Sequence, residues 1–126
     1  MGKIEGKVFS GMEEGSYYLS LDPYKQKIEE AVGFKPFEGT LNLRVDPVEL
    51  KKLEAQREPE VVKSFEYGME EYSRLEIYPV TAEGVEAAYL DIAQTDYGAD
   101  VMELVASGKL RDELGLEDGD TVEVEY

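Results

Sequence analysis

The sequence predicts a mainly β fold: a small barrel of short strands with a few short helices, in a single domain covering all 126 residues. Two observations lead to this prediction. Segments of about five residues that are rich in apolar, β-branched and aromatic side chains recur along the chain, and turns or short helix-forming stretches separate them. The chain is also long enough to bury a core without disulfides or metals.

In the first half of the chain, alternating apolar residues predict strands and capping residues predict helices. The expected strands are residues 3–10, 17–21 and 41–45, the last with the alternation of a half-buried strand. The expected helices are residues 23–32 and 47–55. Gly33 lies where a C-terminal cap belongs, and Asp46 followed by Pro47 is typical of a helix start.

The second half is mostly strand. The expected strands are residues 74–80, 85–92, 101–105 and 121–126, and the first two are separated by a turn around Glu83-Gly84. A short helix is expected over residues 109–114, ending at Gly115. Asp118-Gly119 predicts the turn that leads into the final strand, a structural corner of the barrel.

Composition excludes several kinds of site. The chain has no cysteine, so a disulfide, a zinc thiolate site and a thiol nucleophile are all excluded. It also has no histidine, which removes the usual general base and the commonest ligand of transition metals. Acid–base chemistry must therefore use Asp, Glu, Lys or Tyr, and a metal site built from oxygen ligands favours Mg2+ or Ca2+.

Charge and hydropathy limit the partners and the compartment. With 29 acidic and 13 basic residues the net charge is -16, which repels nucleic acids and anionic membranes, so neither is expected as a partner. The chain begins Met-Gly-Lys-Ile-Glu without an apolar signal segment, and no apolar run approaches the roughly 18 residues that span a bilayer. We expect a soluble, cytoplasmic protein that is a monomer.

The first candidate site lies between two predicted strands. It comprises Gly11, Met12, Glu13, Glu14, Gly15 and Ser16. Two glycines four residues apart let backbone N–H groups converge, as they do in loops that cradle phosphate. An ordinary glycine-containing hairpin explains the same pattern, and the spacing alone favours the hairpin.

The second candidate site is a pair of polar residues on a strand. Thr40 and Asn42 are two residues apart, so both side chains leave one face while Leu41 and Leu43 take the other. A hydroxyl and an amide oxygen side by side can supply two hard ligands to Mg2+. A polar strand face turned to water is the alternative, and spacing alone favours it.

The third candidate site is cationic. Lys109 and Arg111 are two of only 13 basic residues, and both lie at the start of a predicted short helix. An anion there would be held by the side chains and by backbone amides.

Together these stretches resemble the archaeal CTP-dependent riboflavin kinase family. The resemblance is carried by Glu-Gly-Lys-Val-Phe-Ser-Gly at residues 5–11, Glu-Gly-Ser-Tyr-Tyr-Leu-Ser at 14–20, Pro-Tyr at 23–24, Gly-Phe-Lys-Pro-Phe-Glu-Gly-Thr-Leu-Asn-Leu at 33–43 and Lys-Leu-Arg-Asp-Glu-Leu-Gly-Leu-Glu-Asp-Gly-Asp at 109–120. The order and spacing of these motifs are specific, and they cover both ends of the chain. Residues 46–88 match only in outline.

The resemblance implies a six-stranded cradle-loop barrel and the conversion of CTP and riboflavin into CDP and FMN. By similarity, Thr40 and Asn42 would bind Mg2+, and Thr95 and Glu103 would line the flavin. The nucleotide would be bound by Gly11, Met12, Glu13, Glu14, Gly15 and Ser16, and again by Gly108, Lys109, Leu110 and Arg111. The family loop usually has a glycine at the position of Glu13, and a carboxylate there should point away from phosphate.

Two alternatives stay open. Without histidine, Glu103 is the candidate general base by elimination, but the loose transition state of phosphoryl transfer needs little help from a base. Glu103 therefore either acts as the base, contacts the flavin or faces solvent from an edge strand, and we favour the flavin contact. The other alternative is a non-catalytic barrel module that binds flavin or nucleotide without transferring phosphate. The Asp-Gly-Asp corner also occurs in DNA-binding barrels, but those need a basic face.

Overall fold

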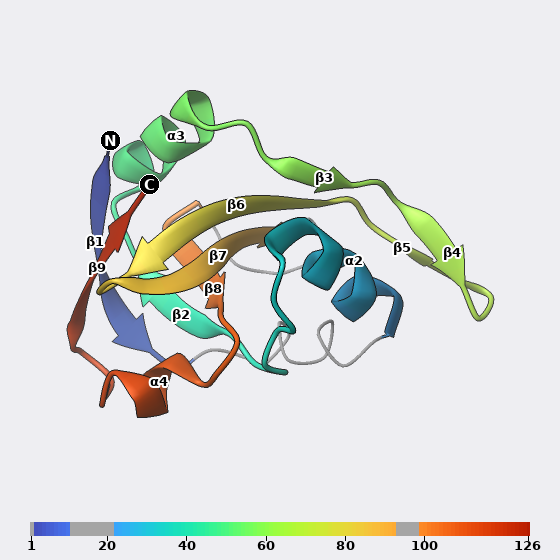
Figure 1. Ribbon diagram of the computed structural model, residues 1–126. Coiled ribbons are helices and arrows are strands. Elements are labelled where there is room, and N and C mark those ends of the chain that lie inside the picture. The colour runs from blue at the N-terminus through green and yellow to red at the C-terminus, as the bar shows by residue number, and fades with distance from the viewer. Residues whose placement is uncertain (1, 11–21, 93–98) are drawn as a thin grey trace.

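The computed structural model describes residues 2–10, 22–92 and 99–126, and a closed antiparallel barrel forms its body (Figure 1). The barrel strands are β1 (Lys3–Phe9), β2 (Leu41–Arg44), β6 (Leu75–Ala82), β7 (Val85–Ile92), β8 (Val101–Val105) and β9 (Thr121–Glu125). Their order is β6-β7-β8-β2-β1-β9, and β9 pairs back with β6 to close the ring. The predicted six-stranded, mainly β barrel is confirmed.

Alternation along the strands builds the barrel core. In β1, the even-numbered residues are buried, and they include Ile4 and Val8. Their neighbours inside the barrel are apolar residues of the other strands, such as Leu43, Met102, Val122 and Val124. Gly6 lies at a close approach to β2, since a Cβ atom there would lie 2.8 Å from the Leu43 Cβ. Local period-two patterning therefore accounts for the inner face of the barrel.

Two helices lie at opposite ends of the barrel (Figure 1). The helix α3 (Pro47–Gln56) starts as predicted, because the Asp46 side chain accepts a hydrogen bond of 2.8 Å from the Val48 N–H. It buries Leu50 and Leu53 against the barrel core. At the other end, α4 (Leu110–Glu113) is a single turn that buries Leu110 in the same core.

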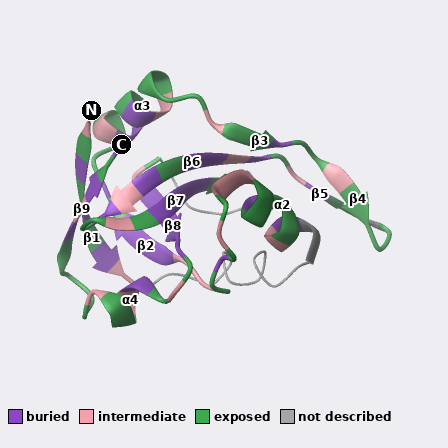
Figure 2. Ribbon diagram, in the orientation of Figure 1, coloured by how far each residue is buried: buried purple, intermediate pink, exposed green. Residues whose placement is uncertain are grey.

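A second hydrophobic core lies outside the barrel. The helix α2 (Asp22–Val32) contributes Tyr24 and Ile28 to it. The outer faces of β6, β7 and β8 supply Leu75, Ile77, Ala88, Leu90, Ile92 and Val105. Every residue of β8 is consequently buried, as the purple colouring of the central strands in Figure 2 illustrates. A strand covered on both faces is apolar nearly throughout, so a charged residue within it needs a reason.

Three short strands between α3 and β6 were not predicted. The strand β3 (Glu60–Val62) pairs with β6 at the edge of the sheet, and β4 (Phe65–Tyr67) and β5 (Glu70–Tyr72) form a hairpin that extends away from the barrel (Figure 1). Each has only three residues, of which one or two are glutamates, which leaves little periodicity to detect. The turn between β4 and β5 has positive φ at Gly68 and Met69, of 61° and 71°.

The remaining predicted elements are confirmed to within two residues, apart from residues 17–21, which lie outside the described part of the chain. The predicted caps Gly33 and Gly115 have φ of 80° and 63°. One detail was wrong: β2 is not half-buried, because both of its faces are covered at Leu41, Asn42 and Leu43. Among the described residues, no helix combines the length and the apolar character needed to cross a bilayer.

Candidate functional site

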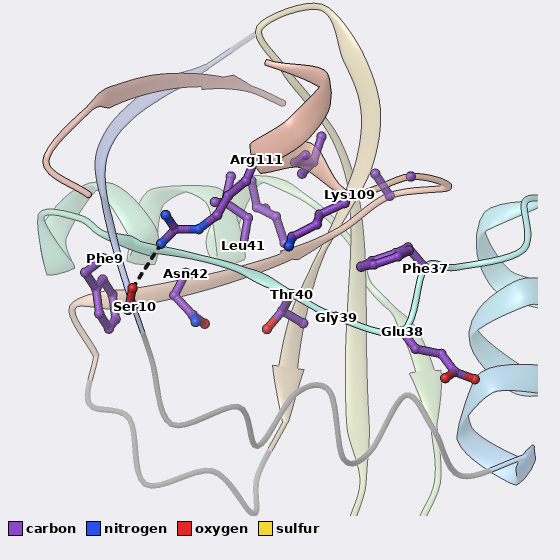
Figure 3. A pocket seen from close by; sticks show the side chains of 14 residues that line it. Phe9, Ser10, Phe37, Glu38, Gly39, Thr40, Leu41, Asn42, Lys109 and Arg111 are labelled. Atoms are coloured by element: carbon purple, nitrogen blue, oxygen red, sulfur yellow. Dashed lines mark hydrogen bonds between the residues drawn. The ribbon is translucent and has the colours of Figure 1, made fainter. Parts of the chain in front are cut away.

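A cavity of about 340 Å³ opens where β1, β2 and β8 meet the segment before α4 (Figure 3). Its lining consists of Phe9, Ser10, Phe37, Glu38, Gly39, Thr40, Leu41, Asn42, Leu104, Ala106, Gly108, Lys109, Leu110 and Arg111. The volume lies within the range of small-molecule sites, about 300–1,000 Å³. The fold thus brings together two predicted site segments that are separated by more than 60 residues in the sequence.

Thr40 and Asn42 lie on one side of the chain, as predicted, and both line the cavity (Figure 3). The alternative of a polar face turned to water is wrong for Asn42, whose side chain is buried with an exposed fraction of 8 %. Its Oδ1 atom has no hydrogen-bond partner among the described residues. A buried amide oxygen without a hydrogen-bond partner lowers the stability of the fold unless a ligand bonds to it.

These residues fit a magnesium ion by the chemistry of their oxygens. Mg2+ takes neutral and anionic oxygen ligands, and it commonly keeps water and substrate phosphates in its shell. The Asn42 Oδ1 atom, which has no partner within the described residues, is an oxygen of this kind, and the Thr40 hydroxyl lies on the same side of the chain. Within the described ranges, no group of three or more Asp or Glu residues is placed to hold a metal instead.

Glu103 lies directly opposite Asn42 in the β2–β8 register and is buried, with an exposed fraction of 4 %. The interpretation that it faces solvent from an edge strand is wrong, because β8 lies between β7 and β2. The cavity lining includes Asn42 but not Glu103. Burying a carboxylate is costly without compensating contacts, so a purely incidental position is disfavoured.

The two predicted cations both line the cavity, although the helix that contains Arg111 is only one turn long. Lys109 is the N-cap residue of α4, and its ammonium group extends into the cavity in Figure 3. Within the described part of the chain, Lys109 forms no ion pair. Arg111 pairs with Asp118, with 2.6 Å between Nη2 and Oδ1. This guanidinium and a hydrogen bond from Ser10 lower the pKa of the Asp118 carboxyl below its ordinary value.

The presence of glycine at position 108 has a structural explanation. The Glu113 carboxylate occupies the space that a Cβ atom on Gly108 would need. Glu113 belongs to α4, so its carboxylate lies against the backbone just before Lys109. A glycine at this position therefore belongs to the architecture of the cavity wall.

Among the lining residues to which the sequence analysis assigned no site role are Phe9, Phe37 and Glu38. Phe9 lies opposite Asn42 in the β1–β2 register, and the Arg44 guanidinium lies 4.8 Å from the centre of its ring. Phe37 is 40 % exposed. The Glu38 carboxylate points towards α2 and forms an ion pair with Lys25, with 2.6 Å between Oε1 and Nζ. Only the strand register could have found Phe9, since nothing in its local sequence distinguishes it from a core residue.

Several predicted site residues lie outside the described part of the chain. They are Thr95 and the six residues of the predicted glycine loop, Gly11, Met12, Glu13, Glu14, Gly15 and Ser16. Their predicted roles stay predictions.

Comparison with known proteins agrees with the family resemblance found in the sequence. The family model CTP-dep_RFKase, described as a domain of unknown function, DUF120, matches residues 8–126. Similar curated proteins include the riboflavin kinase of Pyrobaculum arsenaticum, which is 42 % identical over 125 residues, covering 98 % of this chain and 60 % of the relative. The riboflavin kinase of Archaeoglobus fulgidus is 39 % identical over 126 residues, covering 98 % of this chain and 54 % of the relative.

A third relative is covered more fully. The riboflavin kinase of Ignicoccus hospitalis is 39 % identical over 123 residues, which is 96 % of this chain and 69 % of the relative. The chain therefore spans between about half and two thirds of the length of these three relatives.

Proposed function

The chain belongs to the CTP-dependent riboflavin kinase family, and from this membership we propose that it transfers the γ-phosphate of CTP to the 5′-hydroxyl of riboflavin. The products would be CDP and FMN. The relatives named above are riboflavin kinases, and the name of the family model supports CTP as the donor.

One observation of this chain carries the proposal. The buried Asn42 oxygen, which has no hydrogen-bond partner in the described part of the chain, lines the same cavity as the cationic side chains of Lys109 and Arg111. Oxygen ligands suit a hard cation, and Lys and Arg suit phosphate. A metal–polyphosphate ligand needs both kinds of group at one place, and the protein's net charge of -16 makes local cations necessary for any such ligand.

The residues of the cavity would act mainly by positioning and charge neutralisation. Phosphoryl transfer has a loose transition state in which charge spreads over the transferred oxygens, so electrostatic stabilisation contributes most of the catalysis. Lys109 and Arg111 would neutralise phosphate charge from the α4 side. Thr40 and Asn42 would hold Mg2+, which when bound neutralises phosphate charge and orients the phosphate oxygens.

Glu103 is proposed to contact riboflavin rather than to remove a proton. Its place opposite Asn42 would bring the flavin close to the metal ligands, where the hydroxyl must meet the phosphate. The weak demand of a loose transition state for a base supports this preference.

The decisive experiment incubates the purified chain with riboflavin and CTP, ATP, GTP or UTP in turn, with and without Mg2+, and measures FMN by chromatography. We expect turnover with CTP and Mg2+ and little turnover with ATP or GTP. Equal rates with ATP would contradict the proposed donor.

The same assay tests the alternative function, a non-catalytic module that binds flavin or nucleotide. Such a module would bind riboflavin, FMN or CTP in a titration and form no FMN with any donor. That result would replace the kinase proposal.

A further inference from the structure

Asp118 connects two segments of the cavity that are far apart in the sequence. Its Oδ1 atom accepts a hydrogen bond from the Arg111 Nη2 group at 2.6 Å. Ser10 donates to both carboxylate oxygens, at 3.1 and 3.0 Å. Arg111 Nη2 also lies 3.4 Å from the Ser10 Oγ, the contact marked by the dashed line in Figure 3. We name these three residues, Ser10, Arg111 and Asp118, the rim network. Ser10 and Arg111 line the cavity, and Asp118 does not.

The backbone around Asp118 is held independently of this network. The Gly119 N–H donates to the Val8 carbonyl at 2.7 Å, and the Val8 N–H donates to the Asp120 carbonyl at 2.9 Å. The Asp120 side chain accepts from the Glu117 N–H at 2.8 Å, within the same turn. These bonds fix the turn to the end of β1. The carboxylate is therefore the fixed partner in the network, and the long Arg111 side chain is the adjustable one.

An exposed ion pair of this kind contributes little to the stability of a fold. The Asp118 side chain is 57 % exposed and that of Arg111 is 28 % exposed. Stability alone thus gives a weak reason for three residues from separate segments to converge. A reason connected with the ligand is stronger, because holding a flexible arginine in its binding geometry removes part of the entropy cost of binding.

We propose that Asp118 is a positioning residue, which holds the Arg111 guanidinium at the edge of the cavity so that it meets the phosphates of a nucleoside triphosphate already oriented. This inference rests on the proposed function. Asp118 occupies one side of the guanidinium fork, and the arginine has five N–H donors, so donors are left for a phosphate. Ser10 immediately precedes the predicted glycine loop, so the network joins the two predicted nucleotide-binding segments through one carboxylate.

The test measures the Kd of CTP by calorimetry, without riboflavin, for the unaltered chain, Asp118→Ala, Arg111→Ala and the double variant. Each single substitution should weaken CTP binding by about tenfold, the loss of one good charge-assisted contact. The double variant should bind no more weakly than Arg111→Ala, because Asp118 acts through the arginine. In turnover, Asp118→Ala should raise the KM for CTP while leaving the KM for riboflavin unchanged.

The matched control is Asp112→Ala, which removes an exposed acidic side chain next to Arg111 that takes no part in the rim network. It should leave the Kd of CTP unchanged or slightly improved, since it only reduces negative charge. Thermal unfolding checks that each variant is folded. If Asp118→Ala unfolds, Asp118→Asn replaces it, because the amide keeps a hydrogen-bond acceptor and loses only the charge. A smaller loss of CTP affinity is expected for that variant.

Three results would overturn the inference. Unchanged CTP binding in Asp118→Ala would mean that the carboxylate does not position the arginine for the ligand, and tighter binding would mean that it competes with phosphate for the arginine. An equal loss from Asp118→Ala in the Arg111→Ala background would mean that it acts independently of Arg111. If the unaltered chain binds no CTP at all, the proposed function fails and this inference fails with it, and that result is distinct from the other two.

Discussion

Asn42 and Glu103 lie opposite each other in the β2–β8 pair, and both are buried although both are polar. Side chains of paired residues leave the same face of a sheet, so the amide and the carboxylate are neighbours. The inner face of these strands belongs to the barrel core, through Leu43 and Met102. The polar pair therefore lies on the outer face. A predicted metal ligand and a predicted flavin contact thus share one small area of the barrel wall.

Replacing Asn42 by Ala should remove most turnover and leave the fold intact. The Oδ1 atom makes no hydrogen bond within the described residues, so its removal sacrifices no protein contact there. Losing a metal ligand should lower FMN formation at limiting Mg2+ by at least about tenfold, since second-sphere changes alone reach that size at metal sites. The measurement is a Mg2+ titration of the rate, with riboflavin binding by fluorescence as the control. Near-normal turnover at limiting Mg2+ would place the metal on other residues.

Replacing Glu103 by Gln separates its two possible roles. As a flavin contact, the loss should appear mainly as weaker binding of riboflavin and FMN, because a hydrogen bond made equally in the ground and transition states changes affinity. Riboflavin titration by fluorescence is compared with kcat at saturating substrates. Unchanged affinity with kcat reduced by about 10²–10⁴-fold would instead identify Glu103 as the general base.

Replacing Gly108 by Ala should weaken CTP binding several-fold with little effect on the melting temperature. The added methyl group meets the Glu113 carboxylate, and either that flexible side chain or the backbone before Lys109 must move. The double variant Gly108→Ala, Glu113→Ala should recover most of the affinity, because the overlap is gone, and Glu113→Ala alone serves as the control. The same loss in both backgrounds would show that the methyl group itself obstructs the ligand.

Lowering the pH from 8 to about 5 should stabilise the end of the barrel beneath α3. There the Tyr89 hydroxyl donates to Glu54 Oε1 at 3.1 Å, and Tyr78 stacks on Tyr89 with 5.4 Å between the ring centres. Burial raises the pKa of Glu54, as do Asp91 and Glu76, although the Tyr89 hydrogen bond opposes the shift. Burial and then Glu76 raise the pKa of Asp91.

The direction of this pH dependence follows from proton linkage. Because the folded pKa of Glu54 is raised, the folded state binds more protons than the unfolded state above the ordinary glutamate pKa of about 4.3. The free energy of unfolding should therefore fall as the pH rises above about 4.3 and through the raised pKa of Glu54. Glu54→Gln keeps an acceptor for Tyr89 and removes the charge, so it should raise the melting temperature near pH 8 by on the order of 1–2 °C, given solvent screening.

Thermal unfolding of Glu54→Gln and the unaltered chain across pH 5–8 measures this difference. Glu58→Gln, at an exposed position just after α3, controls for the general loss of one negative charge from an acidic protein. A pH slope as steep in Glu54→Gln as in the unaltered chain would contradict the role of Glu54.

The sequence by itself determined the elements whose signals are local. The β1 and β9 strands follow from period-two alternation, and the start of α3 follows from Asp46 and Pro47. The caps Gly33 and Gly115 follow from the positive φ that glycine adopts without strain. The motifs also indicated the family, and with it the pairing of Thr40 and Asn42 with Lys109 and Arg111. For the strands, the helix start and the caps, residues a few positions apart carry the complete information.

Only the tertiary structure decided which of these residues meet and which are buried. The spacing of Thr40 and Asn42 is equally typical of a solvated strand face, and it was the closure of β2 between β1 and β8 that buried Asn42 opposite Glu103. Asp118 is a plausible turn residue in the sequence, and its contacts with Ser10 and Arg111 exist because Gly119 bonds to β1, more than 100 residues away. Strand register and long-range packing arise from cooperative contacts between distant segments, which no local window of sequence contains.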